Sequence, residues 1–135
     1  MSDSATPDGQ RGRRWIWCCS GVWLAFVLVI IALADLGRLR PFLTFINAHP
    51  GSDKGGHFVL IGGVAFFFNL SLRCREWRGW LIGSVLVGTL ATLEEISQLS
   101  IPLRTFDLLD LAADFAGICF FGWLAKRLSR PPRQV

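Results

Sequence analysis

WIWCCSGVWLAFVLVIIALADL, residues 15–36, is an apolar run with no charge before Asp35. A helix needs about 20 apolar residues to cross a hydrocarbon core of roughly 30 Å, and this run meets that length alone. A cleaved signal peptide is the alternative, because Ala-Leu-Ala at 32–34 looks like a cleavage site and the Arg-Arg pair at 13–14 is a positive flank. A signal core has only about 7–15 apolar residues, so we expect a retained membrane span.

Three further apolar stretches reach spanning length only when a polar end is counted with each. The stretches 58–72, 80–93 and 115–125 then extend to 53–72, 79–98 and 107–126. The chain has 135 residues, of which 52% are hydrophobic, and its mean hydropathy is +0.45, which is too apolar for an ordinary soluble domain. We predict an all-α, polytopic membrane protein in which four transmembrane helices form a bundle.

The basic residues predict the orientation of this bundle. Ten of the fourteen Lys and Arg fall on one side of the predicted topology: Arg11, Arg13, Arg14, Arg73, Arg75, Arg78, Lys126, Arg127, Arg130 and Arg133. The positive-inside rule then places both termini in the cytoplasm, as expected for a multi-pass protein of the cytoplasmic membrane. The net charge of +4 is therefore a topology signal, and with no soluble basic face we expect no nucleic-acid partner.

Composition also divides the chain. Residues 1–14 are expected to be a disordered cytoplasmic tail, 15–128 the four-helix membrane domain, and 129–135 a C-terminal cytoplasmic tail. The apolar segment 41–46 is too short to span, so it either lies along the interface or folds over the outer face as a lid. Ser52 is placed to cap the second span.

All four cysteines fall toward the cytoplasmic side and are expected to be reduced: Cys18, Cys19, Cys74 and Cys119.

Polar side chains gather at the lengthened ends of the last three spans. Chain direction alternates across a membrane, so the starts of the second and fourth spans and the end of the third share the outer face. Spacings of three and four residues place each group on one helix face, and the three stripes can converge on one pocket. The candidate ligand-binding residues are Asp53, Lys54, His57, Glu95, Gln98, Arg104, Asp107, Asp110 and Asp114.

Helix caps and ion pairs explain part of this set. Asp53 and Asp107 stand at helix N-termini, where a carboxylate accepts from free N–H groups. His57 and Asp114 lie too deep for that, since Asp114 is seven residues, roughly 10 Å, beyond Asp107. Asp114 should face protein or water, and a cluster of ionisable groups within spans is a functional-site hypothesis.

The ordered polar set resembles the VanZ-like family of small integral membrane proteins. The resemblance rests on Asp53-Lys54-x-x-His57-Phe58, Glu95-x-x-Gln98, Arg104, and Asp110 with Gly117 seven residues later, and it covers about residues 53–122. It implies an envelope-associated protein with no agreed reaction, in a family whose founding member is linked by name to glycopeptide resistance. Asp114 stands where the family usually has Asn, so we expect it to be protonated or paired with a cation such as Arg104 or Lys54.

Three functions remain open. The favoured one is a non-enzymatic factor that binds an anionic lipid or a lipid-linked envelope precursor, with Lys54, Arg104 and His57 as the groups to meet phosphate. The second is a small intramembrane hydrolase or phosphotransferase that uses His57 with Glu95 or Asp110. The third is a structural or interaction subunit whose polar cluster locks the bundle. We assign no catalytic residue, expect no cofactor and no resident metal, and leave the oligomeric state open.

Overall fold

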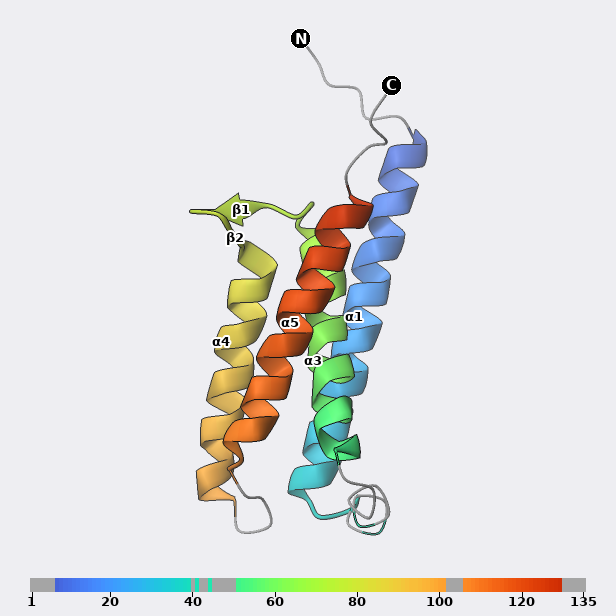
Figure 1. The fold of residues 1–135 in the computed structure, drawn as a ribbon. Helices are drawn as coiled ribbons and strands as arrows, with labels where there is room; N and C mark the ends of the chain where they lie inside the picture. The colour runs from blue at the N-terminus through green and yellow to red at the C-terminus, as the bar shows by residue number, and fades with distance from the viewer. Residues whose placement is uncertain (1–6, 40, 42–43, 45–50, 102–105, 130–135) are drawn as a thin grey trace.

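The chain folds as a mostly helical bundle. A computed structural model describes residues 7–39, 41, 44, 51–101 and 106–129. Within these ranges lie the long helices α1 (Pro7–Asp35), α3 (Ser52–Ser71), α4 (Ile82–Ser97) and α5 (Leu108–Leu128) (Figure 1). The strands β1 (Glu76–Trp77) and β2 (Trp80–Leu81) precede α4, and a 3-10 turn η1 (Gln98–Ser100) extends it at its end. The predicted helical class is confirmed, with a short β-ribbon added.

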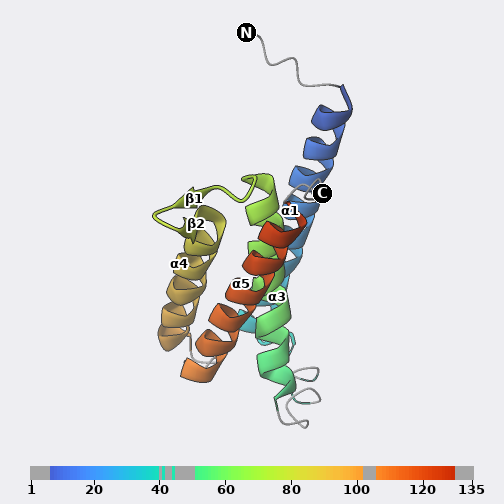
Figure 2. The same cartoon turned by 45° about the horizontal axis from the view of Figure 1, so that its top comes forward.

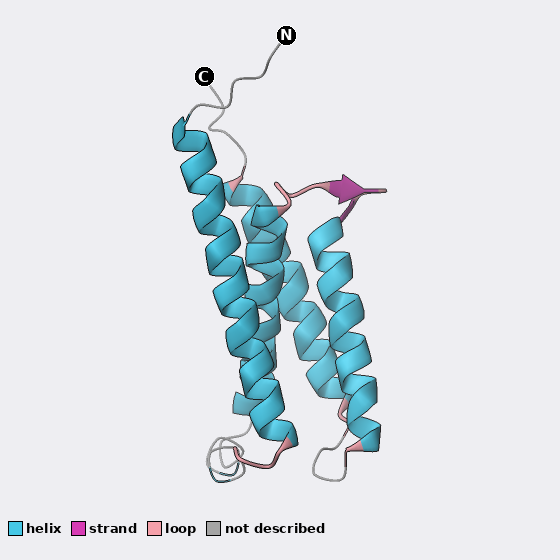
Figure 3. Cartoon of the chain, turned by 180° about the vertical axis from the view of Figure 1, so that it is seen from behind, coloured by secondary structure: helices cyan, strands magenta, loops and turns pink. Residues whose placement is uncertain are grey.

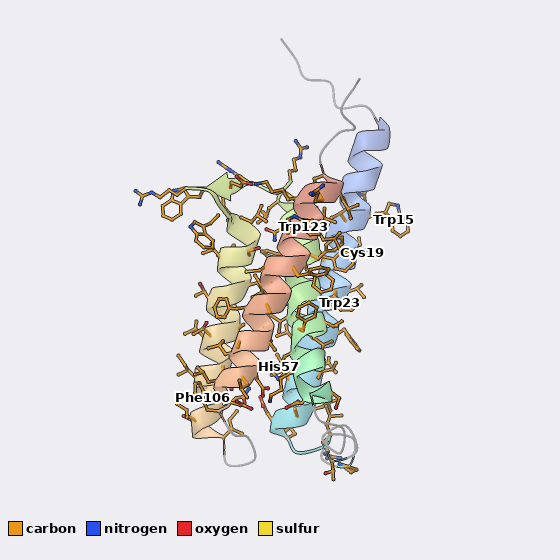
Figure 4. All side chains as sticks on the ribbon, viewed as in Figure 1. Trp15, Cys19, Trp23, His57, Phe106 and Trp123 are labelled. Atoms are coloured by element: carbon orange, nitrogen blue, oxygen red, sulfur yellow. The ribbon has the colours of Figure 1, made fainter. Side chains whose placement is uncertain are left out.

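Successive helices run in opposite directions, as the alternating topology predicts. The start of α1, the end of α3 and the end of α5 share one end of the bundle, which we call the basic end (Figures 1 and 3). The starts of α3 and α5 and the end of α4 lie at the other, which we call the acidic end. Figure 4 places His57 and Phe106 toward the acidic end, and Trp15 and Trp123 toward the basic end. The three predicted polar groups therefore share one end.

Within the described ranges, two helices are long and apolar enough to cross a membrane. They are Arg14–Asp35 and Leu108–Leu128. Helix α4 has 16 residues and rises about 24 Å at 1.5 Å per residue, which is short of a hydrocarbon core. Length and composition alone therefore pick out α1 and α5.

A β-hairpin replaces the start predicted for the third span. Trp77 pairs with Trp80, and the two residues between them both have positive φ, 51° at Arg78 and 84° at Gly79. Positive φ at both central positions is typical of the type I′ turn that suits two-residue hairpins. The predicted helix start at Gly79 is wrong because this turn occupies residues 78–79 and α4 begins at Ile82. Figure 2 shows the hairpin at the start of α4, away from α1.

Two other boundaries differ from the sequence predictions. Helix α1 begins at Pro7, so residues 7–14 are helical where a disordered tail was predicted; proline suits the first position of a helix. Gly51, at φ 84°, occupies the N-cap position of α3, and Ser52 is the first helical residue rather than the cap. Most of the segment 41–46, predicted as a lid or interfacial segment, lies outside the described residues.

Glycines bring α3 and α5 into close contact. A Cβ on Gly117 would overlap the carbonyl oxygen of Phe58, and one on Gly62 would overlap the Phe121 ring. Backbones can approach this closely only where no side chain intervenes, as at small-residue contacts between membrane helices. The contact fixes the height of α3 against α5, and so sets which polar residues of the two helices meet.

Polar side chains are buried and many large apolar side chains are exposed, although an apolar core that includes Val27, Ala65 and Ile118 is buried as well. The largest fully buried side chains are Glu95, Asn69 and Asp114. Large apolar side chains are exposed on each long helix, for example Val22 at 71%, Val59 at 47%, Leu90 at 63% and Phe120 at 48%. Water would penalise this outer surface, whereas a hydrocarbon environment would not.

Candidate functional site

Lys54 joins the start of α3 to the start of α5. Its Nζ donates to Asp107 Oδ2 at 2.8 Å and to Asp110 Oδ1 at 2.6 Å, and Asp53 Oδ2 lies 3.6 Å away. The Lys54 side chain is 32% exposed and that of Asp110 is 12% exposed, so these contacts are partly shielded from water. One ammonium group thus faces three carboxylates, and protein groups compensate its charge.

His57 lies one turn deeper on α3, between two carboxylates of α5. Its Nδ1 is 3.1 Å from Asp114 Oδ1, and its Nε2 is 3.7 Å from Asp110 Oδ2. An ionised carboxylate can only accept, so the short contact requires a proton on either Nδ1 or the Asp114 carboxyl. The Asp114 side chain is 2% exposed and faces protein, as predicted. Its partner here is His57, whereas the sequence suggested Lys54 or Arg104; Arg104 lies outside the described residues.

Glu95 connects the end of α4 to the start of α5. The carboxylate is fully buried and accepts a hydrogen bond from the backbone N–H of Asp107 at 2.8 Å. Gln98 donates from Nε2 to Glu95 Oε2 at 3.3 Å and to Glu94 Oε1 at 3.0 Å. Glu95 therefore satisfies a backbone donor immediately before α5, a role that fixes the position of that helix start.

Asp107 caps α5, as the sequence predicts. Its Oδ1 accepts from the N–H of Leu109 at 2.8 Å while its Oδ2 accepts from Lys54. The Lys54 hydrogen bond, followed by the Leu109 N–H, lowers the pKa of the Asp107 carboxyl below its ordinary value. Asp107 thus remains an acceptor under mildly acidic conditions.

These contacts join the predicted residues that the structure describes, all except Arg104, into one network across three helices. It runs from Asp114 through His57, Asp110, Lys54 and Asp107 to Glu95 and Gln98, with Asp53 beside Lys54. We call this set the acidic network. Carboxylates outnumber cations in it, so the described part of the acidic end has a surplus of hydrogen-bond acceptors. A ligand that brings donors, such as hydroxyl or amine groups, would complement that surplus.

Three members of the network could hold a metal ion. One ligand atom from each of Asp53, His57 and Asp110 lies within 4.8 Å of the others. Carboxylate oxygens with one imidazole do not select a single metal. The Lys54 ammonium is 2.6 Å from Asp110 and 3.6 Å from Asp53, so a divalent cation would meet repulsion there. The geometry therefore favours the ion-paired arrangement.

A polar pair near the basic end was not found from the sequence. Asn69 of α3 is fully buried, donates from Nδ2 to Ser84 Oγ at 2.8 Å and accepts from the Ser84 N–H at 3.2 Å. Ser84 is in the first turn of α4, whose N–H groups lack partners within the helix. Asn69 thus caps a neighbouring helix. Its only sequence signal is a single amide within the apolar run 58–72.

Comparisons with known proteins do not identify the chain. The family models, the curated proteins and the solved structures gave no match. Function therefore has to follow from the acidic network and its surroundings, and the VanZ-like resemblance stays a prediction.

Proposed function

We propose that all four long helices cross the cytoplasmic membrane, with both termini in the cytoplasm. Two observations support this arrangement: each long helix exposes large apolar side chains, and polar side chains such as Glu95, Asn69 and Asp114 are buried between the helices. Helix α3 has 20 residues, enough for roughly 30 Å, and η1 lengthens α4. The described arginines Arg14, Arg73, Arg75 and Arg78 belong to the basic end, which the positive-inside rule assigns to the cytoplasm.

The acidic end would then face the outer leaflet, and we propose that it binds an anionic lipid or a lipid-linked envelope precursor without catalysing a reaction. The observation that supports this most is the acidic network, continuous across three helices. His57, when protonated, would meet a phosphate, while Lys54 stays paired with the carboxylates of Asp107 and Asp110. The surplus carboxylates would accept from hydroxyl or amine groups of the headgroup, which favours a precursor that carries such groups. The VanZ-like resemblance agrees with a role at the envelope.

The test is lipid retention by the purified full-length chain. The protein is extracted from bacterial membranes in mild detergent, and native mass spectrometry identifies retained lipids. We expect a phosphate-containing lipid with a hydroxyl- or amine-rich headgroup, retained about tenfold less by His57→Gln because a charge-assisted contact is lost. Glu76→Gln is the matched control, since it removes a carboxylate paired with Lys126 at the basic end. Equal retention by His57→Gln and the unaltered protein would refute this function.

A second function is favoured by the His57–Asp114 contact. A buried carboxylate 3.1 Å from Nδ1 orients an imidazole, and the other ring nitrogen can then serve as a general base or acid. Such a pair would suit a hydrolase or phosphotransferase acting on a lipid phosphate. Asp114 and Asp110 are the partners for this role, because Glu95 bonds to Gln98 and Asp107. Turnover of a short-chain lipid phosphate that is lost in His57→Gln would favour the enzyme over the binding factor.

The third function, a structural or interaction subunit, predicts a different pattern. Glu95→Gln and Asp110→Asn would then lower the melting temperature while lipid retention stayed at the level of the unaltered protein. Measuring both quantities on the same variants separates a network that binds from a network that only holds helices together.

A further inference from the structure

A second polar site lies at the basic end, where α1 passes the end of α3. A cavity of about 610 Å³ opens there, and its lining includes Arg14 and Trp17 of α1, Ser71 of α3, and Arg73 and Arg75 beyond α3. This volume is in the range of small-ligand pockets, roughly 300–1,000 Å³. The cavity is at the opposite end of α3 from the acidic network, so neither site includes residues of the other.

The three arginines of this cavity are not neutralised by the described part of the chain. Among the described residues, no carboxylate pairs with Arg14, Arg73 or Arg75. Two other described cations at the same end have partners: Lys126 pairs with Glu76, and the Arg127 guanidinium lies over the Trp123 ring. The cavity therefore concentrates positive charge that is available to an external anion.

Ser71 supplies an independent sign of a ligand. The residue is 6% exposed and lines the cavity, yet its Oγ makes no hydrogen bond within the described part of the chain. A buried hydroxyl almost always has a partner, since leaving one unpaired costs free energy. A phosphate oxygen in the cavity would provide the missing acceptor.

The backbone after α3 adopts an uncommon conformation that carries two of the arginines. Arg73 has φ 55° and Cys74 has φ 49°, both in the left-handed region that non-glycine residues seldom occupy. The turn is held by the Cys74 N–H, which donates to the Asn69 carbonyl at 2.7 Å. Together with the Arg73 N–H, which donates to the Leu70 carbonyl at 3.0 Å, this contact forms the ordinary Schellman cap of a helix C-terminus. Here the turn keeps Arg73 and Arg75 in the wall of the same cavity as Arg14.

We propose that this cavity binds the phosphate of an anionic phospholipid headgroup at the cytoplasmic surface of the membrane. Guanidinium groups match phosphate oxygens with paired hydrogen bonds, and a phosphate that enters the cavity would give the buried Ser71 hydroxyl an acceptor. Trp17 is 46% exposed and can lie at the membrane interface beside the headgroup. The proposal rests on the membrane orientation above and is independent of the ligand at the acidic end.

Lipid titration of the full-length protein tests the proposal. The detergent-solubilised protein is titrated separately with phosphatidylglycerol, phosphatidylcholine and inorganic phosphate, and native mass spectrometry measures each bound fraction. We expect phosphatidylglycerol to bind at least about tenfold more tightly than phosphatidylcholine. Phosphatidylglycerol has a net negative charge that the arginines attract, whereas the choline group of phosphatidylcholine neutralises its own phosphate, and a charge-assisted hydrogen bond accounts for a difference of about that size. Inorganic phosphate should displace it only weakly. If inorganic phosphate binds as tightly as the lipid, the assignment to a lipid headgroup is wrong.

Variants distinguish a built site from diffuse attraction. Ser71→Ala and Arg14→Gln should each weaken phosphatidylglycerol binding by about tenfold with unchanged helicity, and Arg14 lies in regular helix, so its replacement spares the fold. Arg127→Gln, the matched control, should alter binding less than about twofold, since Arg127 is at the same end but outside the cavity. An equal loss in Arg127→Gln and Arg14→Gln, or no loss in Ser71→Ala, would overturn the proposal. His57→Gln should leave this binding intact, which separates failure here from failure at the acidic end.

Discussion

The cation at the start of α3 is paired with carboxylates, whereas the cations just beyond its end have no such partner among the described residues. At its start, Lys54 faces the carboxylates of Asp53, Asp107 and Asp110. Beyond its end, Arg73 and Arg75 share a cavity with Arg14, and no carboxylate of the described residues pairs with any of them. One end therefore uses its cation to join helices, while the other keeps its cations available.

In this small bundle, a charged side chain can therefore either hold helices together or remain available to bind a ligand. Removing a cation that holds several carboxylates together leaves like charges close to one another in a partly shielded place, which destabilises the fold. Removing an exposed cation without a partner changes stability little and affects only what binds there. The predictions below test that contrast, beginning with the largest expected effect.

The first prediction breaks the contact that aligns the acidic network. Gly117→Ala places a Cβ against the Phe58 carbonyl, and since both are backbone-anchored, α3 and α5 must separate at a cost of about 3 kcal/mol. Lys54 would then move away from Asp110. Reversible unfolding in detergent, followed by circular dichroism, measures the loss. Phosphatidylglycerol binding at the basic end should persist in the folded fraction, because that cavity lies between α1 and α3.

Gly21→Ala is the control for this change. Gly21 lies within α1, and a Cβ there would meet no atom within 4 Å. Alanine is the better helix former, so this variant should be neutral or slightly more stable, by up to about 1 kcal/mol. A loss in Gly21→Ala equal to that in Gly117→Ala would show that close approach of α3 and α5 is not the cause.

The second prediction compares the two ends directly. Lys54→Met keeps the apolar stem but leaves Asp53, Asp107 and Asp110 without their cation, and we expect a loss of about 2 kcal/mol, between the values for exposed and buried pairs. Arg73→Gln at the basic end should change stability by less than about 0.5 kcal/mol. The same unfolding assay measures both. Adding Asp110→Asn to Lys54→Met should restore part of the lost stability, because it removes one of the crowded negative charges. Equal losses of stability in Lys54→Met and Arg73→Gln would contradict the difference proposed between the two ends.

The sequence predicted which residues share an end but not how they pair. Span length and alternating direction were enough to place Lys54, Glu95 and Asp110 together. The pairing of His57 with Asp114 depends on how far each helix is rotated and shifted, which the glycine contact of α3 with α5 fixes between residues distant in the chain. Spacing along one helix carries no information about that contact. The bilayer crossing of all four helices and the nature of the ligand stay predictions.

Local signals account for the boundaries that the sequence misplaced. Trp80 and Leu81 extend the apolar run of α4, so the run concealed the Arg78-Gly79 turn that joins the two strands of the hairpin. The polar composition of residues 1–14 suggested disorder, although Pro7 is a suitable first residue for a helix. The arginine cavity could not be predicted, since Arg14 and Ser71 meet only through the packing of α1 on α3.

The third prediction asks whether the basic end has a structural anchor of its own. Asn69→Ala removes the cap from the first turn of α4 and the hydrogen bond to Ser84, and we expect a loss of about 1 kcal/mol. Thr89→Val is the control, because the Thr89 hydroxyl bonds only to the Val85 carbonyl of its own helix. Unfolding in detergent compares the two. A loss larger than that of Lys54→Met would place the main polar anchor at the basic end and reverse the contrast.

The last and smallest effect is the acid response of Asp107. Its pKa lies below the ordinary 3.8 because Lys54 and the Leu109 N–H bond to the ionised form. A carboxyl with a lowered folded-state pKa binds fewer protons when folded than when unfolded, so its contribution is complete above about pH 4 and is lost as pH falls through the lowered value. The melting temperature of the unaltered protein should therefore fall more between about pH 5 and pH 3 than that of Asp107→Asn, which cannot titrate there. Arg73→Gln should keep the full acid response, since Arg73 lies at the opposite end of α3 from Asp107. An acid response as steep in Asp107→Asn as in the unaltered protein would assign the titration to another group and weaken the distinction between the ends.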